Sequence, residues 1–346
     1  MSERLTKGYA TEEILRNYFN GMGFYVARGV KYKYHNFDVT DIDLLLYGKS
    51  SPLNRERINV DIKNKKTPQA IERIFWAKGL QQILKLDDCI VVTSENRSDV
   101  MDFGLKHNIR VLDGKFLDRL SKSNKSASER LTEEAFSKLV EEASNGKIGG
   151  DWKGKLEVAK SRLLEHLSFD GCNAYLNDIK YFLHCVSELQ DKSKEAAALW
   201  RAIYATTSYF LLSLDYLLKD HQTSDQEQRK RFLDSGFRYG TSGKAFTERM
   251  GSMASALAGS VMPNMGVSQE IERELKRLSE SVRSEILSEH FSKANVNNAL
   301  FECAREYEFF AYEKEVFPPS NLSSLSQAAL AILCDFNELD RKKIIF

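Results

Sequence analysis

An acid and a lysine stand close together in the segment at residues 58–63, which alternates apolar and polar side chains. In an extended chain, alternate side chains point to opposite faces, so Asp61 and Lys63 share the polar face. Asp43 follows the same alternation in residues 40–47. If the two segments pair as strands, two carboxylates and one ammonium converge. Carboxylate oxygens are ligands that Mg²⁺ prefers, and a bound divalent cation supports hydrolysis of a phosphodiester.

Each of these residues has an expected part in that chemistry. Asp43 and Asp61 would bind the cation, with the backbone carbonyl of Ile62 as a further ligand. Lys63 would lower the pKa of the attacking water or stabilise charge that develops on the phosphate. Glu12, on an earlier helix, would complete the site through a water or a second metal. The alternative interpretation is an exposed ion pair between Asp61 and Lys63, which contributes little to stability.

The elements that must position these residues are visible in the hydrophobic periodicity. Thr67 and Pro68 suit the start of a helix, as an N-cap followed by proline at the first helical position. The predicted order is a helix at 8–23, strands at 24–30, 38–47 and 57–63, a helix at 67–84, a strand at 89–93, a helix at 99–106 and a strand at 109–112. This order predicts an α/β domain with a mixed central sheet flanked by helices.

Basic residues around these elements are candidates for contact with nucleic-acid phosphates. Residues 31–37 are basic and aromatic, and they suit either a nucleic-acid-facing segment or a solvated turn. On the helix at 67–84, one polar side chain is expected to face the site, and the sequence leaves Lys78, Gln81 and Gln82 as alternatives. The expected nucleic-acid-binding residues are Arg28, Lys31, Lys33, Lys65, Lys66, Lys78 and Gln82.

The composition and the hydrophobic periodicity of the chain change after residue 120. Residues 121–128 are rich in serine and lysine and predict a linker, and helical periodicity dominates residues 129–346. The expected helices run over 129–143, 153–169, 174–190, 194–219, 269–294, 296–316 and 322–337. Residues 236–259 are rich in Gly, Ser and Ala, which suits either a loop or a closely packed helix. A mainly α-helical domain for recognition, oligomerisation or regulation is therefore expected at 129–346.

Composition restricts the class of protein further. The formal net charge is only +1, but residues 1–120 carry 20 Lys+Arg against 16 Asp+Glu, and the remainder carries 30 against 33. The first part is thus mildly basic, which would suit contact with nucleic acid if the basic residues cluster. Five scattered cysteines and no apolar leader predict a cytoplasmic protein without a disulfide framework. The apolar run at 199–218 contains Arg201 and Asp215, so it predicts a buried core helix and not a membrane span.

Residues 7 to about 120 resemble the PD-(D/E)xK, or restriction-endonuclease-like, nuclease superfamily. The likeness is greatest to Mrr-type restriction endonucleases and archaeal Holliday-junction resolvases. It is carried by the opening at residues 7–12, the strand entry at 23–28, the segment 40–44 with Asp43 in the place of the first metal-binding acid, and residues 59–63, which match (D/E)xK.

The resemblance implies a Mg²⁺- or Mn²⁺-dependent endonuclease that hydrolyses DNA phosphodiester bonds in restriction or antiviral defence of a prokaryote. It implies Asp43 and Asp61 as metal ligands, Lys63 as the catalytic lysine and Glu12 as an auxiliary acid. Two alternatives remain open at this stage: a catalytically silent nucleic-acid-binding scaffold or sensor, and a nuclease that acts on RNA. The expected partners are DNA, a second copy of the chain and a protein bound by the helical domain, with no membrane.

Overall fold

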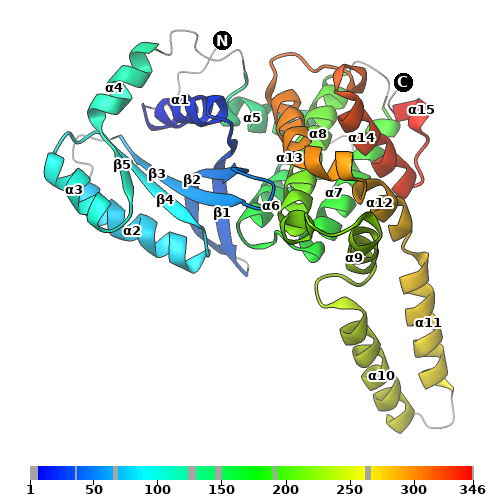
Figure 1. The fold of residues 1–346 in the computed structure, drawn as a ribbon. Coiled ribbons are helices and arrows are strands. Elements are labelled where there is room, and N and C mark those ends of the chain that lie inside the picture. The colour runs from blue at the N-terminus through cyan, green and yellow to red at the C-terminus, as the bar shows by residue number, and fades with distance from the viewer. Residues whose placement is uncertain are drawn as a thin grey trace. The chain divides into compact units, whose positions relative to one another are not determined.

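The structure is a computed structural model that describes residues 7–35, 37–64, 69–123, 130–144, 150–189, 193–261 and 266–344. The chain divides into two compact units. Unit 1 comprises residues 1–165 and 309–316, and unit 2 comprises residues 166–308 and 317–346. Unit 1 contains a mixed β-sheet with flanking helices, whereas the described part of unit 2 is helical (Figure 1).

The sheet of unit 1 has five strands in the spatial order in which they occur in the chain. They are β1 (Tyr25–Tyr34), β2 (Phe37–Gly48), β3 (Glu56–Lys63), β4 (Asp88–Thr93) and β5 (Arg110–Leu112). The first three strands pair antiparallel, and β4 and β5 add in parallel to β3. A parallel pair requires a crossover connection, and α2 (Ala70–Ile83) and α3 (Ser98–Lys106) supply the two crossovers (Figure 1).

Helices cover both faces of this sheet. On one face, α1 (Lys7–Gly21) and α4 (Gly114–Ser123) pack on a core that includes Leu15, Leu44 and Val60. On the other face, α2 and α3 pack on a second core that includes Ile74 and Val91. Because side chains alternate along β3, Val60 and Ile62 enter the first core and Asp61 and Lys63 point to the α2 side.

The element order predicted for residues 8–112 is confirmed, with boundaries that differ by a few residues. The largest difference is in β1, which extends to Tyr34, so the basic and aromatic segment is part of a hairpin arm and not only a turn. The predicted helix start at Thr67 and Pro68 lies outside the described residues. The described part of α2 begins at Ala70, and Gln69 precedes it with a positive φ of 50°.

Two further helices belong to unit 1, although the sequence suggested a division after residue 120. They are α5 (Glu133–Ser144) and α6 (Trp152–Glu165), and α6 packs against β1. In the predicted linker at 121–128, residues 121–123 form the last turn of α4, and residues 124–128 lie outside the described chain. The contacts thus group residues 129–165 with the sheet, which the break in composition did not indicate.

Unit 2 is built around α8 (Lys194–Leu217), whose side chains are almost all buried from Ala196 to Asp215. This confirms that the apolar run at 199–218 forms a core helix. The other α-helices described in unit 2 are α7 (Phe169–Ser187), α9 (Gln226–Tyr239), α10 (Gly243–Val261), α11 (Val267–Ser281), α12 (Ser284–Phe291), α13 (Ala294–Tyr312), α14 (Ser324–Phe336) and α15 (Arg341–Ile344). The residues of α13 after 308 belong to unit 1. Among the described residues, no helix has the length and hydrophobicity needed to span a membrane.

Two boundaries in unit 2 differ from the sequence prediction. The helix expected at 269–294 is two helices, α11 and α12, which are interrupted at Val282, where the backbone is extended. For the Gly-, Ser- and Ala-rich segment at 236–259, the structure shows the closely packed helix and not a loop, because α10 occupies most of the segment. Small residues there permit close approach of the neighbouring helix α11, and the two form a hairpin (Figure 1).

Candidate functional site

Asp43 lies where the antiparallel ladder between β2 and β3 ends. The last pair of this ladder is Leu44 with Val60, and the next pair in the same register would be Asp43 with Asp61. The two strands separate there, and the carboxylate of Asp43 replaces a backbone acceptor. Its Oδ2 accepts a hydrogen bond from the backbone N–H of Ile62 at 2.6 Å. Asp43 and Asp61 therefore lie on the same face of neighbouring strands, as their alternation predicted.

Gly29 lies opposite Asp43 in the neighbouring strand β1, because Arg28 pairs with Leu44 and Val30 pairs with Ile42. Gly29 has a φ of +60°, a conformation that glycine adopts without the strain a side chain would cause. A Cβ at this position would meet no atom within 4 Å. The position opposite Asp43 on β1 therefore carries no side chain, and the space beside Gly29 is free.

Asp61 is paired with an arginine that the sequence did not single out. Its side chain is 6% exposed, and the Nε of Arg73 donates to its Oδ2 at 2.7 Å. The Nη2 of Arg73 also donates to Oδ1, so both carboxylate oxygens are occupied. This bidentate geometry is the strong form of a carboxylate–guanidinium pair. Asp61 would bind a cation only after Arg73 moves.

The first turn of α2, and not its later turns, faces the site. Because α2 follows β3 and rises about 1.5 Å per residue, Lys78 and Gln82 lie roughly 7 and 13 Å further along its axis than Arg73. Lys78 acts electrostatically on Cys89, Gln81 bonds with Cys89 and Asp87, and Gln82 is exposed near the helix end. None of the three candidates named from the sequence therefore lies at Asp61, and position along the helix was the signal that pointed to Arg73.

Glu12 is held on α1 by a buried arginine. The Nε of Arg28 donates to Oε2 of Glu12 at 2.8 Å, and its Nη1 donates to Glu13 at 2.8 Å. Arg28 also binds both carboxylate oxygens of Glu134 on α5, at 2.7 and 2.8 Å, and is only 2% exposed. The expectation that Arg28 contacts phosphate does not fit this environment. Arg28 instead joins β1, α1 and α5 within unit 1.

Burial shapes the electrostatics of the two acids. It raises the pKa of Glu12, an effect opposed by Arg28 and reinforced by the charge of Asp43. It likewise raises the pKa of Asp43, against the hydrogen bond from Ile62 and the charge of Lys63. Glu12 and Asp43 therefore lie within electrostatic reach of each other, which is what an auxiliary acid beside a metal ligand requires.

Lys63 is the third member of the predicted set, and its charge acts on Asp43. It is half-buried at the end of β3, next to Asn64, whose side-chain amide donates to Thr11 on α1 at 2.8 Å. That bond fixes the end of β3 against the turn of α1 that carries Glu12. Ile62 lies in the core and gives its N–H to Asp43, and a role for its carbonyl as a ligand stays a prediction.

The donor chemistry at Asp43 and Asp61 fits a hard divalent cation, but the site is not assembled as a cage. Within the described ranges, no three His, Cys, Asp or Glu side chains lie close enough together to hold a metal ion. Two carboxylates with several water ligands is a common arrangement for Mg²⁺. The residues present therefore fit a two-carboxylate site that requires displacement of Arg73.

The other basic residues are distributed differently from the prediction. Lys31 forms an ion pair with Glu157 at 2.7 Å, and the hydrogen bond with that acid raises its pKa. Lys33 lies 3.6 Å from Asp38 across the β1–β2 hairpin, with a third of its side chain exposed. Lys65 and Lys66 lie outside the described residues. Lys33, beside the exposed aromatic side chains of Tyr34 and Phe37, is thus the best described candidate for contact with nucleic acid.

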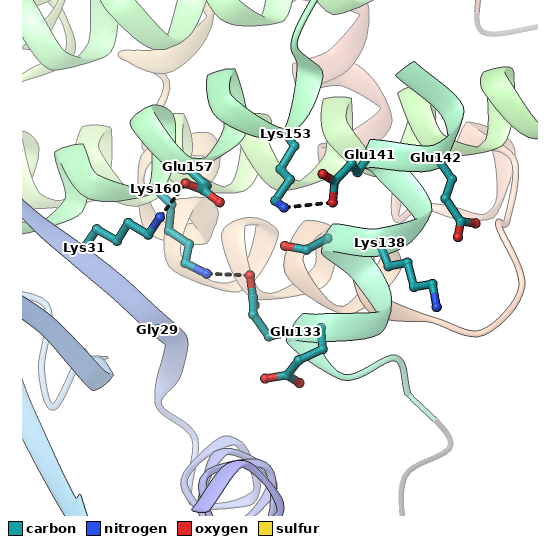
Figure 2. A pocket seen from close by; sticks show the side chains of 11 residues that line it. Gly29, Lys31, Glu133, Lys138, Glu141, Glu142, Lys153, Glu157 and Lys160 are labelled. Carbon is teal, nitrogen blue, oxygen red and sulfur yellow. Dashed lines mark hydrogen bonds and ion pairs between the residues drawn. The ribbon is translucent and has the colours of Figure 1, made fainter. Parts of the chain in front are cut away.

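A second hollow in unit 1 has a volume of about 600 Å³ and lies between β1, α5 and α6. Gly29, which lies opposite Asp43 in the β1–β2 register, is one of the residues that line it. Figure 2 shows its ion pairs, which join Lys160 to Glu133 at 2.5 Å and Lys153 to Glu141 at 2.8 Å. Since its lysines and glutamates largely neutralise one another, the hollow shows no preference for an anionic or a cationic ligand.

Comparison with known proteins adds no relative to this picture. No protein-family model, curated protein or solved structure matches the chain.

Proposed function

We propose that unit 1 is a metal-dependent endonuclease that hydrolyses phosphodiester bonds in DNA. One observation carries the proposal: Asp43 and Asp61 occupy the positions that follow the last β2–β3 pair, where Asp43 accepts the Ile62 N–H and the charge of Lys63 acts on Asp43. The sheet order, an antiparallel hairpin followed by parallel strands, supports the restriction-endonuclease-like fold suggested by the sequence. Restriction or antiviral defence in a prokaryote is the proposed setting.

The residues of the chain have distinct parts in this reaction. The Ile62 N–H fixes the orientation of Asp43, and Asp61 becomes a ligand when Arg73 releases it. A bound Mg²⁺ or Mn²⁺ would act as a Lewis acid and lower the pKa of a coordinated water. Lys63 would stabilise negative charge on the phosphate as the bond breaks. Glu12, with its raised pKa, would exchange a proton nearby.

Nicking of supercoiled plasmid tests the proposal directly. Wild-type protein should convert plasmid to open circles with Mg²⁺ or Mn²⁺ and not with EDTA, and Lys63→Ala should slow this at least about 100-fold. Parallel reactions with single-stranded DNA and RNA decide the sugar and strand preference. Cleavage that persists at the wild-type rate in Lys63→Ala would assign the activity to another site.

A catalytically silent nucleic-acid-binding scaffold is the second candidate, and a specific observation favours it. Arg73 occupies both oxygens of Asp61, and no three-residue metal group is present in the part of the chain described. If the Asp61–Arg73 pair is permanent, the site binds no cation. Retained DNA binding without cleavage under any metal condition would establish this candidate.

The Asp61–Arg73 pair can be tested through metal binding alone. Arg73→Ala should free Asp61 and strengthen Mn²⁺ binding about tenfold, equivalent to ~1.4 kcal/mol. Isothermal titration calorimetry of the DNA-free protein measures this without any dependence on activity. Arg97→Ala, which removes an exposed Arg–Asp pair that includes neither Asp43 nor Asp61, is the matched control and should leave binding unchanged. Weaker binding in Arg73→Ala would show that Arg73 supports the site and does not close it.

Metal affinity should also depend on pH. Burial raises the pKa values of Asp43 and Glu12 above their ordinary values of 3.8 and 4.5, so protons compete with the cation at a higher pH than is usual for carboxylates. Mn²⁺ affinity should therefore fall as the pH drops through these raised values, before the ordinary range is reached. Calorimetric titrations at successive pH values measure the loss. An affinity that stays constant down to the ordinary carboxylate range would contradict the prediction.

A further inference from the structure

The hairpin of α10 and α11 carries a row of large apolar side chains that no part of the described chain covers. Phe246, Met250, Met253, Leu257 and Val261 recur along α10 at intervals of four, three, four and four residues. Their exposed fractions are 53, 48, 51, 67 and 73%, in the same order. With 3.6 residues per turn, this spacing aligns all five along one side of the helix.

The opposite side of α10 makes the contacts within the hairpin. Gly251, Ser255 and Gly259 recur every four residues and lie about half a turn around the helix from the apolar row. Ser255 Oγ donates to the Ser268 carbonyl on α11 at 2.9 Å, and Ser268 Oγ donates back to the Ser255 carbonyl at 2.6 Å. A Cβ at Gly251 would lie 2.9 Å from the side chain of Leu275. The hairpin is therefore closed by small residues, and the apolar row is not part of its interior.

The alternation of three- and four-residue intervals is the pattern by which helices pack as knobs into holes. It therefore suits another helix better than a groove or a flat surface. Small Ala and Ser side chains flank the row, and the helix carries no charged residue from Met250 to Val261, so that Arg249, near the Phe246 end, is the one basic side chain of α10 beside the row. A nucleic acid or an acidic membrane would require basic residues along this face.

We propose that the apolar row of α10 is a homodimer interface, in which the same row of a second copy of this chain packs against it. An isologous interface places one surface patch against itself, and a row without charges creates no like-charge repulsion when it does so. Five half-exposed large side chains from each copy would bury on the order of 1,000 Å² in total, which is near the lower limit for a specific interface. The row uses no residue of the candidate nuclease site, so the two proposals stand or fall separately.

Sedimentation velocity of the full-length protein over a range of concentrations tests the interface. Wild type should sediment as a dimer. Leu257→Glu, which places a charge within the row, should weaken dimerisation at least about 100-fold, because the interface would bury an unpaired carboxylate from each copy. Ser252→Glu adds the same charge to an exposed position of the same helix outside the row and should remain dimeric. Circular dichroism should show equal helix content in all three proteins, since Leu257 is 67% exposed.

Three results would overturn the proposal. One is a wild-type protein that stays monomeric up to high micromolar concentration. Another is a Leu257→Glu variant that remains dimeric, since the dimer would then use another surface. The last is a monomeric wild type that co-sediments with vesicles of anionic phospholipid and loses this binding in Leu257→Glu, which would identify a lipid surface as the occupant.

Discussion

Asp43→Asn should abolish metal-dependent cleavage of plasmid DNA while leaving the fold intact. The asparagine carbonyl can still accept the hydrogen bond from the Ile62 N–H, so the end of the β2–β3 ladder should keep its geometry. Only the negative charge and one ligand oxygen are lost. Loss of an outer-shell partner costs roughly 10- to 100-fold in metal affinity or activity, and loss of a direct ligand should cost more, so we expect a decrease of well over about 100-fold.

Asp41→Asn is the matched control for this experiment. Asp41 lies two residues before Asp43 on the same strand face, is exposed, and loses the same charge on substitution. Its variant should cleave within about threefold of wild type, because exposed charges contribute weakly through solvent. Initial nicking rates at saturating Mn²⁺, together with thermal unfolding of each variant, separate catalysis from stability. Equal rates for Asp43→Asn and wild type would refute the assignment of Asp43.

Arg28→Met should destabilise the protein by about 3–5 kcal/mol at neutral pH, the usual result of removing one partner from a buried ionic group. Arg28 is 2% exposed and is the shared partner of Glu12, Glu13 and Glu134. Burial acts to lower its pKa, but the bond to Glu134 and the charges of Glu13 and Glu12 outweigh burial and raise it. Methionine of similar length fills the space but removes the cation shared by the three carboxylates, of which Glu13 keeps Arg16 at 3.5 Å.

The pH dependence of this loss identifies its cause. Without Arg28, Glu12 and Glu134 should bind protons more tightly in the folded than in the unfolded chain, because burial then acts on their pKa values without the opposing guanidinium. A carboxylate whose pKa is raised in the folded chain contributes stability at low pH that is lost as the pH rises. The difference in free energy of unfolding between wild type and Arg28→Met should therefore become smaller as the pH falls from about 7 to about 5. Urea unfolding at both pH values measures the change. Arg97→Met, at an exposed arginine, should leave the free energy of unfolding close to that of wild type at both pH values. A deficit that does not change with pH would point to lost packing and not to uncompensated charge.

Local periodicity was sufficient to place the acids and the lysine. The two-residue alternation in residues 58–63 assigned Val60 and Ile62 to the core and Asp61 and Lys63 to the opposite face, and the structure has this arrangement. The same rule placed Asp43 beside Asp61 as soon as β2 and β3 paired. Element order in residues 8–112 was equally accessible, because glycines, polar turns and apolar runs mark each boundary.

Long charged side chains were beyond the reach of such patterns. Arg28 lies in a strand and its alternation gives its face, yet only the packing of α1 and α5 on that face supplies Glu12 and Glu134 as its partners. Position along α2 is a signal that separates Arg73 from Lys78 and Gln82, but the contact of Arg73 with Asp61 forms only when α2 packs against β3. An arginine reaches several ångströms from its backbone, so its partner is chosen by tertiary neighbours.

The sequence by itself determined the faces on which Asp43, Asp61 and Lys63 lie, because side-chain direction in a strand is a local property of the backbone. Only the tertiary structure decided which of these groups are free to act. It joined Asp43 to the Ile62 N–H, placed Gly29 with its positive φ opposite Asp43, and paired Asp61 with Arg73. Those pairings join separate segments of the chain, and their physical cause is the packing of helices on the two faces of the sheet, which no short pattern of residues encodes.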